Sequence, residues 1–303
     1  MANFEALQKW GWNEHFEALW NEDLRENAVP ARVIEQQRKY WRIAGEFGES
    51  WAEPSGKLRL ATDEAVEWPA VGDWVAAEVG SGKSNAVILE VLPRRSRFVR
   101  KTPGKQIAEQ VIAANVDTAL LVTALDGDYN PRRVERYLAQ CWESGARPVV
   151  VLNKADACVD ALRKAAEIEN VALGAAVCVV SAKTGQGMDE LEPFLKRGDT
   201  LVLLGSSGVG KSTIANRLAG EALQETQPVR EADSRGRHTT SSRTLMALPG
   251  GALLMDTPGL RELQLWSADE GVAETFEDID ALAAQCRFTN CGHHARGNQI
   301  EAT

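Results

Sequence analysis

Apolar and polar residues change their spacing several times along the 303-residue chain, and these changes divide it into four segments. In residues 1–30, apolar and aromatic residues recur at helical spacing among acids, which predicts short amphipathic helices ending before Pro30. In residues 31–98, short β-like runs alternate with glycine-rich turns. Five such runs predict a small β-barrel: Ala31–Ile34, Tyr40–Ala44, Lys57–Leu60, Trp74–Val79 and Ala86–Leu92.

Residues 99–268 have a third pattern, in which apolar runs alternate with amphipathic stretches. Thr118–Ala124 is typical of a buried strand, and Pro131–Ser144 carries its apolar residues on one helical face. Buried strands are also predicted at Arg147–Leu152, Ala176–Val180 and Leu201–Leu204, and a hairpin at residues 245–255. This alternation favours an α/β domain with a mostly parallel sheet. The fourth segment, residues 269–303, carries a cluster of cysteine and histidine residues.

A glycine-rich loop between a predicted strand and a predicted helix gives the first chemical signal. It reads Gly205-Ser-Ser-Gly-Val-Gly-Lys-Ser212, the pattern of a phosphate-binding loop. Its glycines let backbone N–H groups converge on phosphate, while Lys211 can reach the β and γ oxygens and Ser212 can bind Mg²⁺. A chance match is the alternative. The candidate nucleotide contacts here are Gly205, Ser206, Ser207, Gly208, Val209, Gly210, Lys211, Ser212 and Thr213.

Two further loops at strand ends have the residues that read guanine. One is Asn153-Lys154-Ala-Asp156, whose aspartate can accept from guanine N1–H and N2–H₂, a pair of bonds that adenine cannot offer. The other is Ser181-Ala182-Lys183, whose backbone N–H groups suit guanine O6. Each loop alone is a weak signal, because an Asn-Lys turn after a strand is common. Together they favour GTP and GDP as ligands.

The remaining parts of a GTPase lie downstream of the phosphate loop, although the base-reading loops lie upstream. Asp256 and Gly259 belong to an Asp-Thr-Pro-Gly motif that would hold Mg²⁺ and sense the γ-phosphate. Thr239 or Thr240, in the polar stretch before that motif, is the expected second Mg²⁺ ligand beside Ser212. A cyclic shift of the sequence keeps all spatial neighbours when the original termini lie close together. The order therefore predicts a circularly permuted P-loop GTPase.

With these motifs in this order, the chain resembles the RsgA family of bacterial small-subunit-dependent GTPases over nearly its whole length. Further shared stretches are Pro69–Val75, Leu92–Ser96 and Gly236–Thr240. The resemblance implies that the barrel is an OB-fold that binds RNA. It also implies a partner, the small (30S) ribosomal subunit with its 16S rRNA, and a role in late maturation that includes displacing other assembly factors. We expect a monomer.

Composition limits how RNA could be bound. The net charge is −9, so contact with RNA depends on local patches. The candidate contacts are Arg94, Arg95, Arg97, Arg100 and Lys101, in a run without acids, and Arg237. A solvated linker is the alternative for that run. The sequence has no run of eighteen apolar residues and no signal peptide, and its five cysteines lack a disulfide framework, so we expect a cytoplasmic protein without membrane contact.

The resemblance also implies a C-terminal helical element that binds zinc. Cys286, Cys291 and His293 match the start of the family's zinc site, but Gln299 stands where the family has a third cysteine. A structural Zn²⁺ site takes four ligands, so the site is incomplete here. The alternative is that the two cysteines are free thiols in the terminal segment.

Hydrolysis of GTP needs a group that positions water. Leu260 occupies the place of the glutamine that performs this role in Ras-like GTPases, so intrinsic turnover should be slow. His238 is the candidate catalytic residue, with contact to RNA as its alternative role. Two other function classes stay open: a GTP-gated rRNA-binding factor with negligible turnover, and a P-loop kinase or ATPase.

Overall fold

The computed structural model describes residues 4–21, 24, 26, 28–37, 39–61, 67–80, 85–102, 108–127, 129–220 and 243–256. Two short helices begin the chain, α1 (Phe4–Gln8) and α2 (Glu14–Leu19). The side chain of Asn13 caps α2 by accepting from the N–H of His15. The sequence prediction of short N-terminal helices is therefore confirmed.

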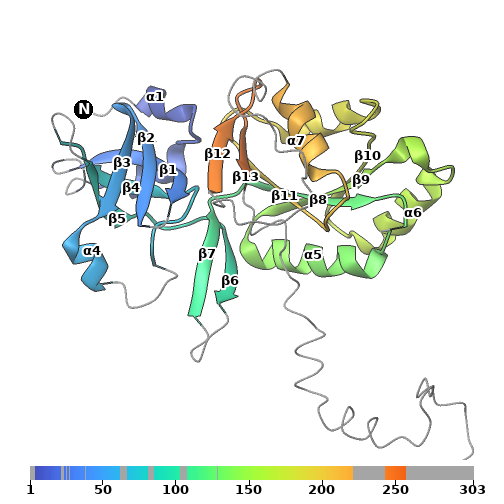
Figure 1. Ribbon diagram of the computed structural model, residues 1–303, viewed down its shortest axis with the longest axis horizontal. Helices are drawn as coiled ribbons and strands as arrows, with labels where there is room; N and C mark the ends of the chain where they lie inside the picture. Colours follow the sequence, from blue (N-terminus) through green and yellow to red (C-terminus); the bar gives the residue numbers. More distant parts are fainter. Residues whose placement is uncertain are drawn as a thin grey trace, which may run out of the picture. The chain divides into compact units, whose positions relative to one another are not determined.

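Five strands close into a barrel after these helices (Figure 1). They are β1 (Val29–Gln37), β2 (Tyr40–Gly45), β3 (Gly48–Pro54), β4 (Trp74–Glu78) and β5 (Ala86–Val91). Their order is β1-β2-β3-β5-β4, and β4 pairs with β1 to complete the ring. Alternate residues such as Val33, Ile43 and Ile88 fill the interior, because strand side chains point to the two faces in turn.

One of the five predicted strands is wrong. Lys57–Leu60 lies in a helix, α4 (Gly56–Ala61), and the third strand of the barrel is β3 instead. Two apolar residues alternating with two charged ones fit either structure over so short a run. The hydroxyl oxygen of Ser55 accepts from the N–H of Leu58 at 3.1 Å, a capping bond that starts a helix.

A two-stranded antiparallel sheet, β6 (Arg97–Thr102) with β7 (Ala108–Ala114), follows the barrel. The α/β part of the chain comes next. Its elements are β8 (Thr118–Ala124), α5 (Pro131–Ser144), β9 (Arg147–Asn153), η1 (Ala155–Ala157), α6 (Ala161–Val171), β10 (Ala176–Val179), η2 (Met188–Phe194), β11 (Thr200–Leu204), α7 (Lys211–Ala219), β12 (Arg243–Ala247) and β13 (Leu253–Asp256).

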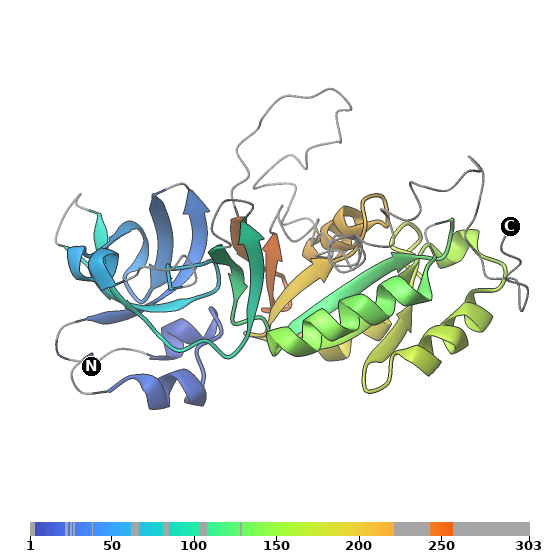
Figure 2. The same ribbon diagram turned by 90° about the horizontal axis from the view of Figure 1, so that it is seen from below.

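Strands β10, β9, β8, β11 and β13 form a parallel sheet in that order, and β12 joins its edge antiparallel to β13. Helix α7 covers one face of this sheet and α5 the other (Figures 1 and 2). The predicted strand–helix alternation and the predicted hairpin before Asp256 are both confirmed. The fold thus combines a five-stranded barrel with an α/β GTPase-type domain.

Strand β12 also pairs with barrel strand β1, so that barrel and α/β sheet are continuous. The register places Glu35 opposite Thr244 and Gln36 opposite Arg243, and the Arg243 guanidinium donates to the Gln36 side-chain oxygen at 3.3 Å. Within the described ranges, no helix is long and apolar enough to span a membrane.

Candidate functional site

The phosphate-binding loop runs from the end of β11 to the start of α7. Two of its glycines leave no room for a side chain. A Cβ on Gly205 would lie 2.1 Å from the carbonyl oxygen of Val122, and one on Gly210 would lie 2.2 Å from Asn153 Nδ2. Both glycines also have positive φ angles, 140° and 99°. This backbone therefore fits the tight curl that a phosphate-binding loop needs.

The ammonium group of Lys211 lies over this loop. Its Nζ donates to the carbonyl oxygens of Gly205 at 2.6 Å and Ser206 at 2.5 Å, and the residue is buried. Ser212 and Thr213 are exposed in the first turn of α7. The first turn of a helix presents unpaired N–H groups and partial positive charge, so the arrangement fits a polyphosphate.

Asn153 connects the phosphate loop to both predicted base-reading loops. It lies buried at the end of β9, where its Nδ2 donates to the carbonyl oxygen of Val209 at 2.8 Å. Its Oδ1 accepts from the N–H of Ala182 at 3.0 Å. One amide side chain thus fixes three strand ends, β9, β10 and β11, relative to one another.

Asp156 and Lys154, two residues of the first predicted base-reading loop, are held by their neighbours. The Ser181 hydroxyl donates to Asp156 Oδ1 at 2.6 Å, and Ser181 Oγ accepts from the N–H of Thr184 at 3.2 Å. Asp156 remains exposed. Lys154 has a left-handed backbone, with φ 66°, and its Nζ pairs with Asp126 Oδ2 at 2.7 Å. These contacts orient a carboxylate and an ammonium group at the carboxyl edge of the sheet.

Three residues of this region were missed by sequence reasoning. Asp126 pairs with Lys154 after β8, and the guanidinium of Arg133 on α5 donates to Ser206 Oγ at 2.7 Å. Arg217 on α7 donates to the carbonyl oxygens of Ala182 and Lys183. No motif spacing identifies these residues, since each comes from a different element. Only the arrangement of the sheet and its helices brings them to the loops.

The three cysteines described in the α/β domain differ in burial. Cys141 and Cys178 are buried, and Cys158 is half-buried. Burial raises the pKa of the Cys141 thiol to about 12 and that of Cys178 to about 11, with a smaller contribution to the latter from Glu190. A buried thiol with a raised pKa is a poor nucleophile, so Cys141 and Cys178 are packing residues of this domain.

The basic run that follows the barrel and continues into β6 contains residues with different surroundings. The guanidinium of Arg94 pairs with Asp73 at 2.7 Å and donates to the carbonyl oxygen of Trp68, and only 11% of its side chain is exposed. Arg95 pairs with Asp117 at 2.8 Å. Arg97 and Arg100 are exposed on β6. Within the run, Arg97 and Arg100 are therefore better placed than Arg94 to meet a phosphate backbone.

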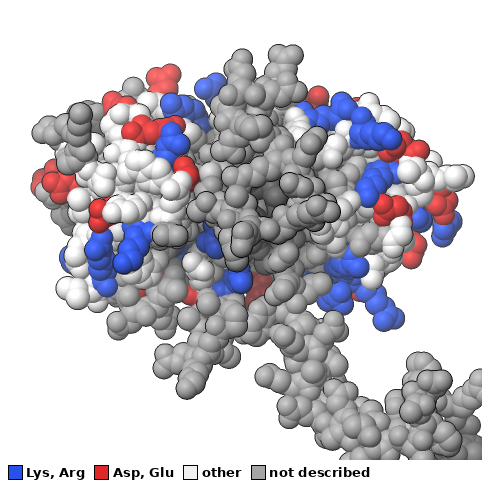
Figure 3. All heavy atoms as spheres, in the orientation of Figure 1, with Lys and Arg blue, Asp and Glu red and all other residues white. Residues whose placement is uncertain are grey.

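Charge on the visible face is mixed. Lys and Arg side chains gather in several separate groups there, with Asp and Glu side chains between them (Figure 3). Among the described residues drawn in this view, the basic side chains form no single continuous field.

Several predicted residues lie outside the described part of the chain. They are Arg237, His238, Thr239, Thr240, Gly259, Cys286, Cys291 and His293, together with the side chains of Lys101 and Asp256. Among the residues that are described, no group of three or more His, Cys, Asp or Glu side chains is placed to hold a metal ion.

Comparison with known proteins agrees with this geometry. The family model described as RsgA GTPase matches residues 91–266. A protein of Opitutus terrae named "Small ribosomal subunit biogenesis GTPase RsgA" is 48% identical over 297 residues, which cover 95% of this chain and 81% of that protein. A protein of the same name from Syntrophotalea carbinolica is 47% identical over 297 residues, covering 95% and 80%.

Solved structures show the same architecture. YjeQ from Thermotoga maritima matches with a TM-score of 0.59 and 26% identity, over 88% of this chain and 86% of that one. The structure of YloQ, described as a circularly permuted GTPase, matches with a TM-score of 0.56 and 21% identity, over 89% and 85%, and supports the fold alone. On the family match and the identity of its relatives, this chain belongs to the RsgA GTPase family.

Proposed function

We propose that this GTP hydrolase binds the small ribosomal subunit and assists its late maturation, with slow turnover alone and faster turnover on the subunit. The observation that carries the proposal is the junction at Asn153, which holds a phosphate loop and two guanine-type loops at one sheet edge. The names of the relatives supply the ribosomal context.

The described residues supply the proposed contacts to the nucleotide. In the proposal, loop N–H groups and Lys211 bind the β and γ phosphates, while Asp156 accepts from guanine N1–H and N2–H₂. The Ser181 hydroxyl keeps that carboxylate oriented, which favours guanine over adenine because adenine would leave the carboxylate unpaired.

Hydrolysis would draw on residues proposed from the sequence. We assign Mg²⁺ to Ser212, Asp256 and either Thr239 or Thr240, with Gly259 sensing the γ-phosphate. When bound, Mg²⁺ would neutralise developing charge on the phosphates. His238 would hold the attacking water, because Leu260 cannot hydrogen-bond to it.

Docking would involve more than the nucleotide domain. The division into an N-terminal helical segment (1–30), an RNA-binding barrel (31–98), a GTPase domain (99–268) and a C-terminal element (269–303) remains part of the proposal. Arg97 and Arg100 are exposed on β6, where they could contact 16S rRNA. Zinc bound by Cys286, Cys291 and His293, a cytoplasmic location, a monomeric state and contact with other assembly factors belong to the same proposal.

The test is GTP turnover by the purified chain with and without purified small subunits. We expect the subunits to accelerate turnover strongly and Lys211→Ala to abolish the stimulated rate. Lys196→Ala, an exposed lysine in the turn before β11, is the matched control and should behave as the parent chain.

Other outcomes would support other functions. Turnover that the subunits leave slow and unchanged, although GTP still binds and promotes docking, would favour a GTP-gated rRNA-binding factor. That second candidate is favoured by Leu260 and by Gln299 in the zinc motif. Equal competition by ATP and GTP would instead favour a P-loop kinase or ATPase.

A further inference from the structure

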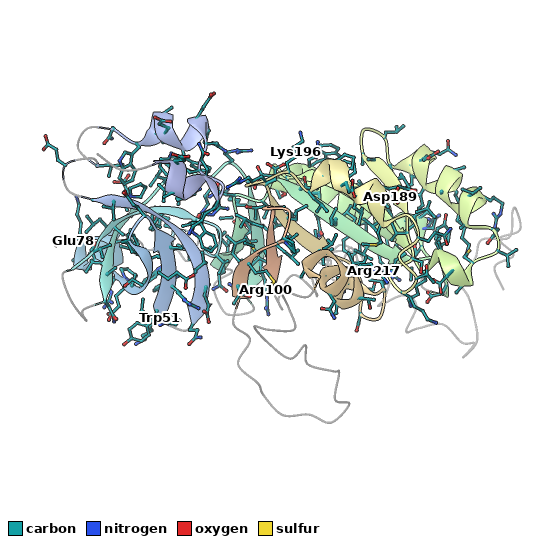
Figure 4. The ribbon with its side chains drawn as sticks, turned by 90° about the horizontal axis from the view of Figure 1, so that it is seen from above. Trp51, Glu78, Arg100, Asp189, Lys196 and Arg217 are labelled. Atoms are coloured by element: carbon teal, nitrogen blue, oxygen red, sulfur yellow. The ribbon has the colours of Figure 1, made fainter. Side chains whose placement is uncertain are left out.

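Arg217 bridges the phosphate end and the base end of the nucleotide site. It lies on α7, the helix that begins at Lys211, and extends toward the loop after β10 (Figure 4). Its Nε donates to the carbonyl oxygen of Ala182 at 2.7 Å, and its Nη2 donates to the carbonyl oxygen of Lys183 at 2.9 Å. One edge of the guanidinium group therefore donates to the carbonyl oxygens of two consecutive residues in the guanine-type loop.

A hydrogen bond to a carbonyl oxygen also fixes the orientation of the N–H in the same peptide group. The carbonyl of Ala182 and the N–H of Lys183 belong to one peptide unit, and the described chain contains no cis peptide. In a trans peptide the C=O and N–H point in opposite directions. The bond from Arg217 to the Ala182 oxygen consequently fixes the direction in which the Lys183 N–H points.

The Lys183 N–H is the donor that this loop has left for a ligand. The N–H of Ala182 donates to Asn153 Oδ1, and the N–H of Thr184 donates to Ser181 Oγ. Within the residues described, the N–H of Lys183 makes no hydrogen bond. A guanine O6 is the acceptor that would complete the loop.

The surroundings of Arg217 fit this role. A Cβ on Gly185 would lie 2.8 Å from Arg217 Nη1, so glycine there leaves space for the guanidinium. Arginine suits the position better than lysine, because its planar fork can donate two parallel bonds at fixed spacing. A positively charged donor beside a carbonyl oxygen also polarises the peptide group and strengthens its N–H as a hydrogen-bond donor.

We propose that Arg217 is a positioning residue for base recognition: it orients the Lys183 N–H toward O6 of a bound guanine nucleotide. The inference deepens the proposed function and rests on it. It also links the two ends of the site, because Lys211 and Arg217 are carried by one helix.

The test compares GDP with two analogues, each of which differs from GDP at one position of the base. GDP has O6 and the N2 amine, IDP keeps O6 without the N2 amine, and 6-thio-GDP keeps N1–H and the N2 amine but has sulfur, a weak acceptor, in place of O6. Dissociation constants are measured for the parent chain, Arg217→Met, Arg217→Lys and a matched control, Arg136→Met, which changes an exposed arginine of α5.

We expect Arg217→Met to weaken binding of GDP and IDP by about tenfold each, the size expected for one hydrogen bond. Binding of 6-thio-GDP should change by less than about twofold, because that ligand makes little use of the N–H. Arg217→Lys should recover part of the loss, and Arg136→Met should match the parent chain.

An equal loss for all three nucleotides would overturn the inference, since Arg217 would then only support the loop as a whole. An unchanged affinity for GDP in Arg217→Met would overturn it as well. A parent chain that binds no GDP would remove the proposed function together with the inference, an outcome distinct from the other two.

Discussion

At the scale of single residues, neighbouring arginines of one basic run have different surroundings. Arg94 donates from Nε to Asp73 Oδ1 at 2.8 Å and from Nη2 to Oδ2 at 2.7 Å, and the Asp73 side chain is fully buried. The same carboxylate accepts from the N–H of Ala70. Arg97 is three residues away and exposed. A run of basic residues in a sequence can therefore contain both a structural ion pair and free surface charge.

These surroundings predict effects of different size for the same substitution at the two positions. Arg94→Met should lower the free energy of unfolding by about 3–5 kcal/mol, because it leaves the Asp73 carboxylate buried without its cationic partner. Arg97→Met should change it by less than about 0.5 kcal/mol. Urea denaturation of both variants measures the difference.

The variants Arg94→Met and Arg97→Met also distinguish an effect on stability from an effect on RNA binding. If Arg97 contacts RNA, Arg97→Met should weaken subunit binding and reduce its dependence on salt by about one phosphate contact. Equal destabilisation by the two substitutions would contradict the buried ion pair. Unchanged salt dependence in Arg97→Met would remove Arg97 from the RNA contacts.

At the scale of elements, sequence patterning predicts most of the α/β domain and less of the barrel. The predicted bounds of β8 and α5 are the observed ones, because α5 keeps a helical period over 14 residues whereas β8 is a short, continuously buried run. The strand predicted at Lys57–Leu60 is a helix, because four alternating residues cannot distinguish the two and a capping bond from Ser55 decides.

The candidate site divides in the same way. The loop motifs could be found from the sequence, because phosphate and guanine binding need fixed residues at fixed spacing. Asp126, Arg133 and Arg217 could not, since their partners lie far away in the sequence and no periodicity relates them. A sequence therefore predicts binding motifs whose residues are adjacent in the chain. Supporting contacts between separate elements depend on how those elements pack.

Strand β12 lies between the nucleotide domain and the barrel. It pairs with β13, which ends at Asp256, and with β1 at Glu35 and Gln36. We expect a non-hydrolysable GTP analogue to slow hydrogen exchange at residues 33–37 of β1 more than GDP does. The reason is that changes near Asp256 reach β1 through a single intervening strand.

Hydrogen exchange followed by mass spectrometry tests this coupling. Strand β5 is the internal control, because it pairs with β3 and β4 and not with β12. Equal exchange of β1 in the two nucleotide states would show that the continuous sheet does not transmit the difference.

At the scale of the whole described structure, one buried arginine joins the N-terminal helices, the barrel and the α/β sheet. Arg32 lies on β1 with 1% of its surface exposed, and it stacks over the ring of Trp74. It donates to the carbonyl oxygens of Trp10 and Asn115 and to the Thr200 hydroxyl at the start of β11. Burial lowers the pKa of Arg32 to about 10, partly offset by Asp117 and Asp73, so the guanidinium stays charged at neutral pH.

The contacts of Arg32 predict that the barrel and the α/β domain unfold together. Seven of the nine tryptophans lie between residues 10 and 74, so tryptophan fluorescence mainly reports the barrel and the N-terminal helices. Binding of a fluorescent GDP analogue reports the α/β domain. In the parent chain we expect the two signals to be lost at one urea concentration, because Arg32 makes the parts cooperative.

Arg32→Met should separate the two transitions. The substitution keeps an apolar side chain of similar length in the space but removes the donors shared by Trp10, Asn115 and Thr200. The fluorescence midpoint should then fall below the nucleotide-binding midpoint, because charge-assisted hydrogen bonds between the parts, worth about 1.5–3 kcal/mol each, are lost. Arg42→Met, which changes an arginine of β2 with 43% of its side chain exposed, should leave the midpoints coincident. Coincident midpoints in Arg32→Met would instead mean that the β1–β12 pairing alone makes the two parts unfold together.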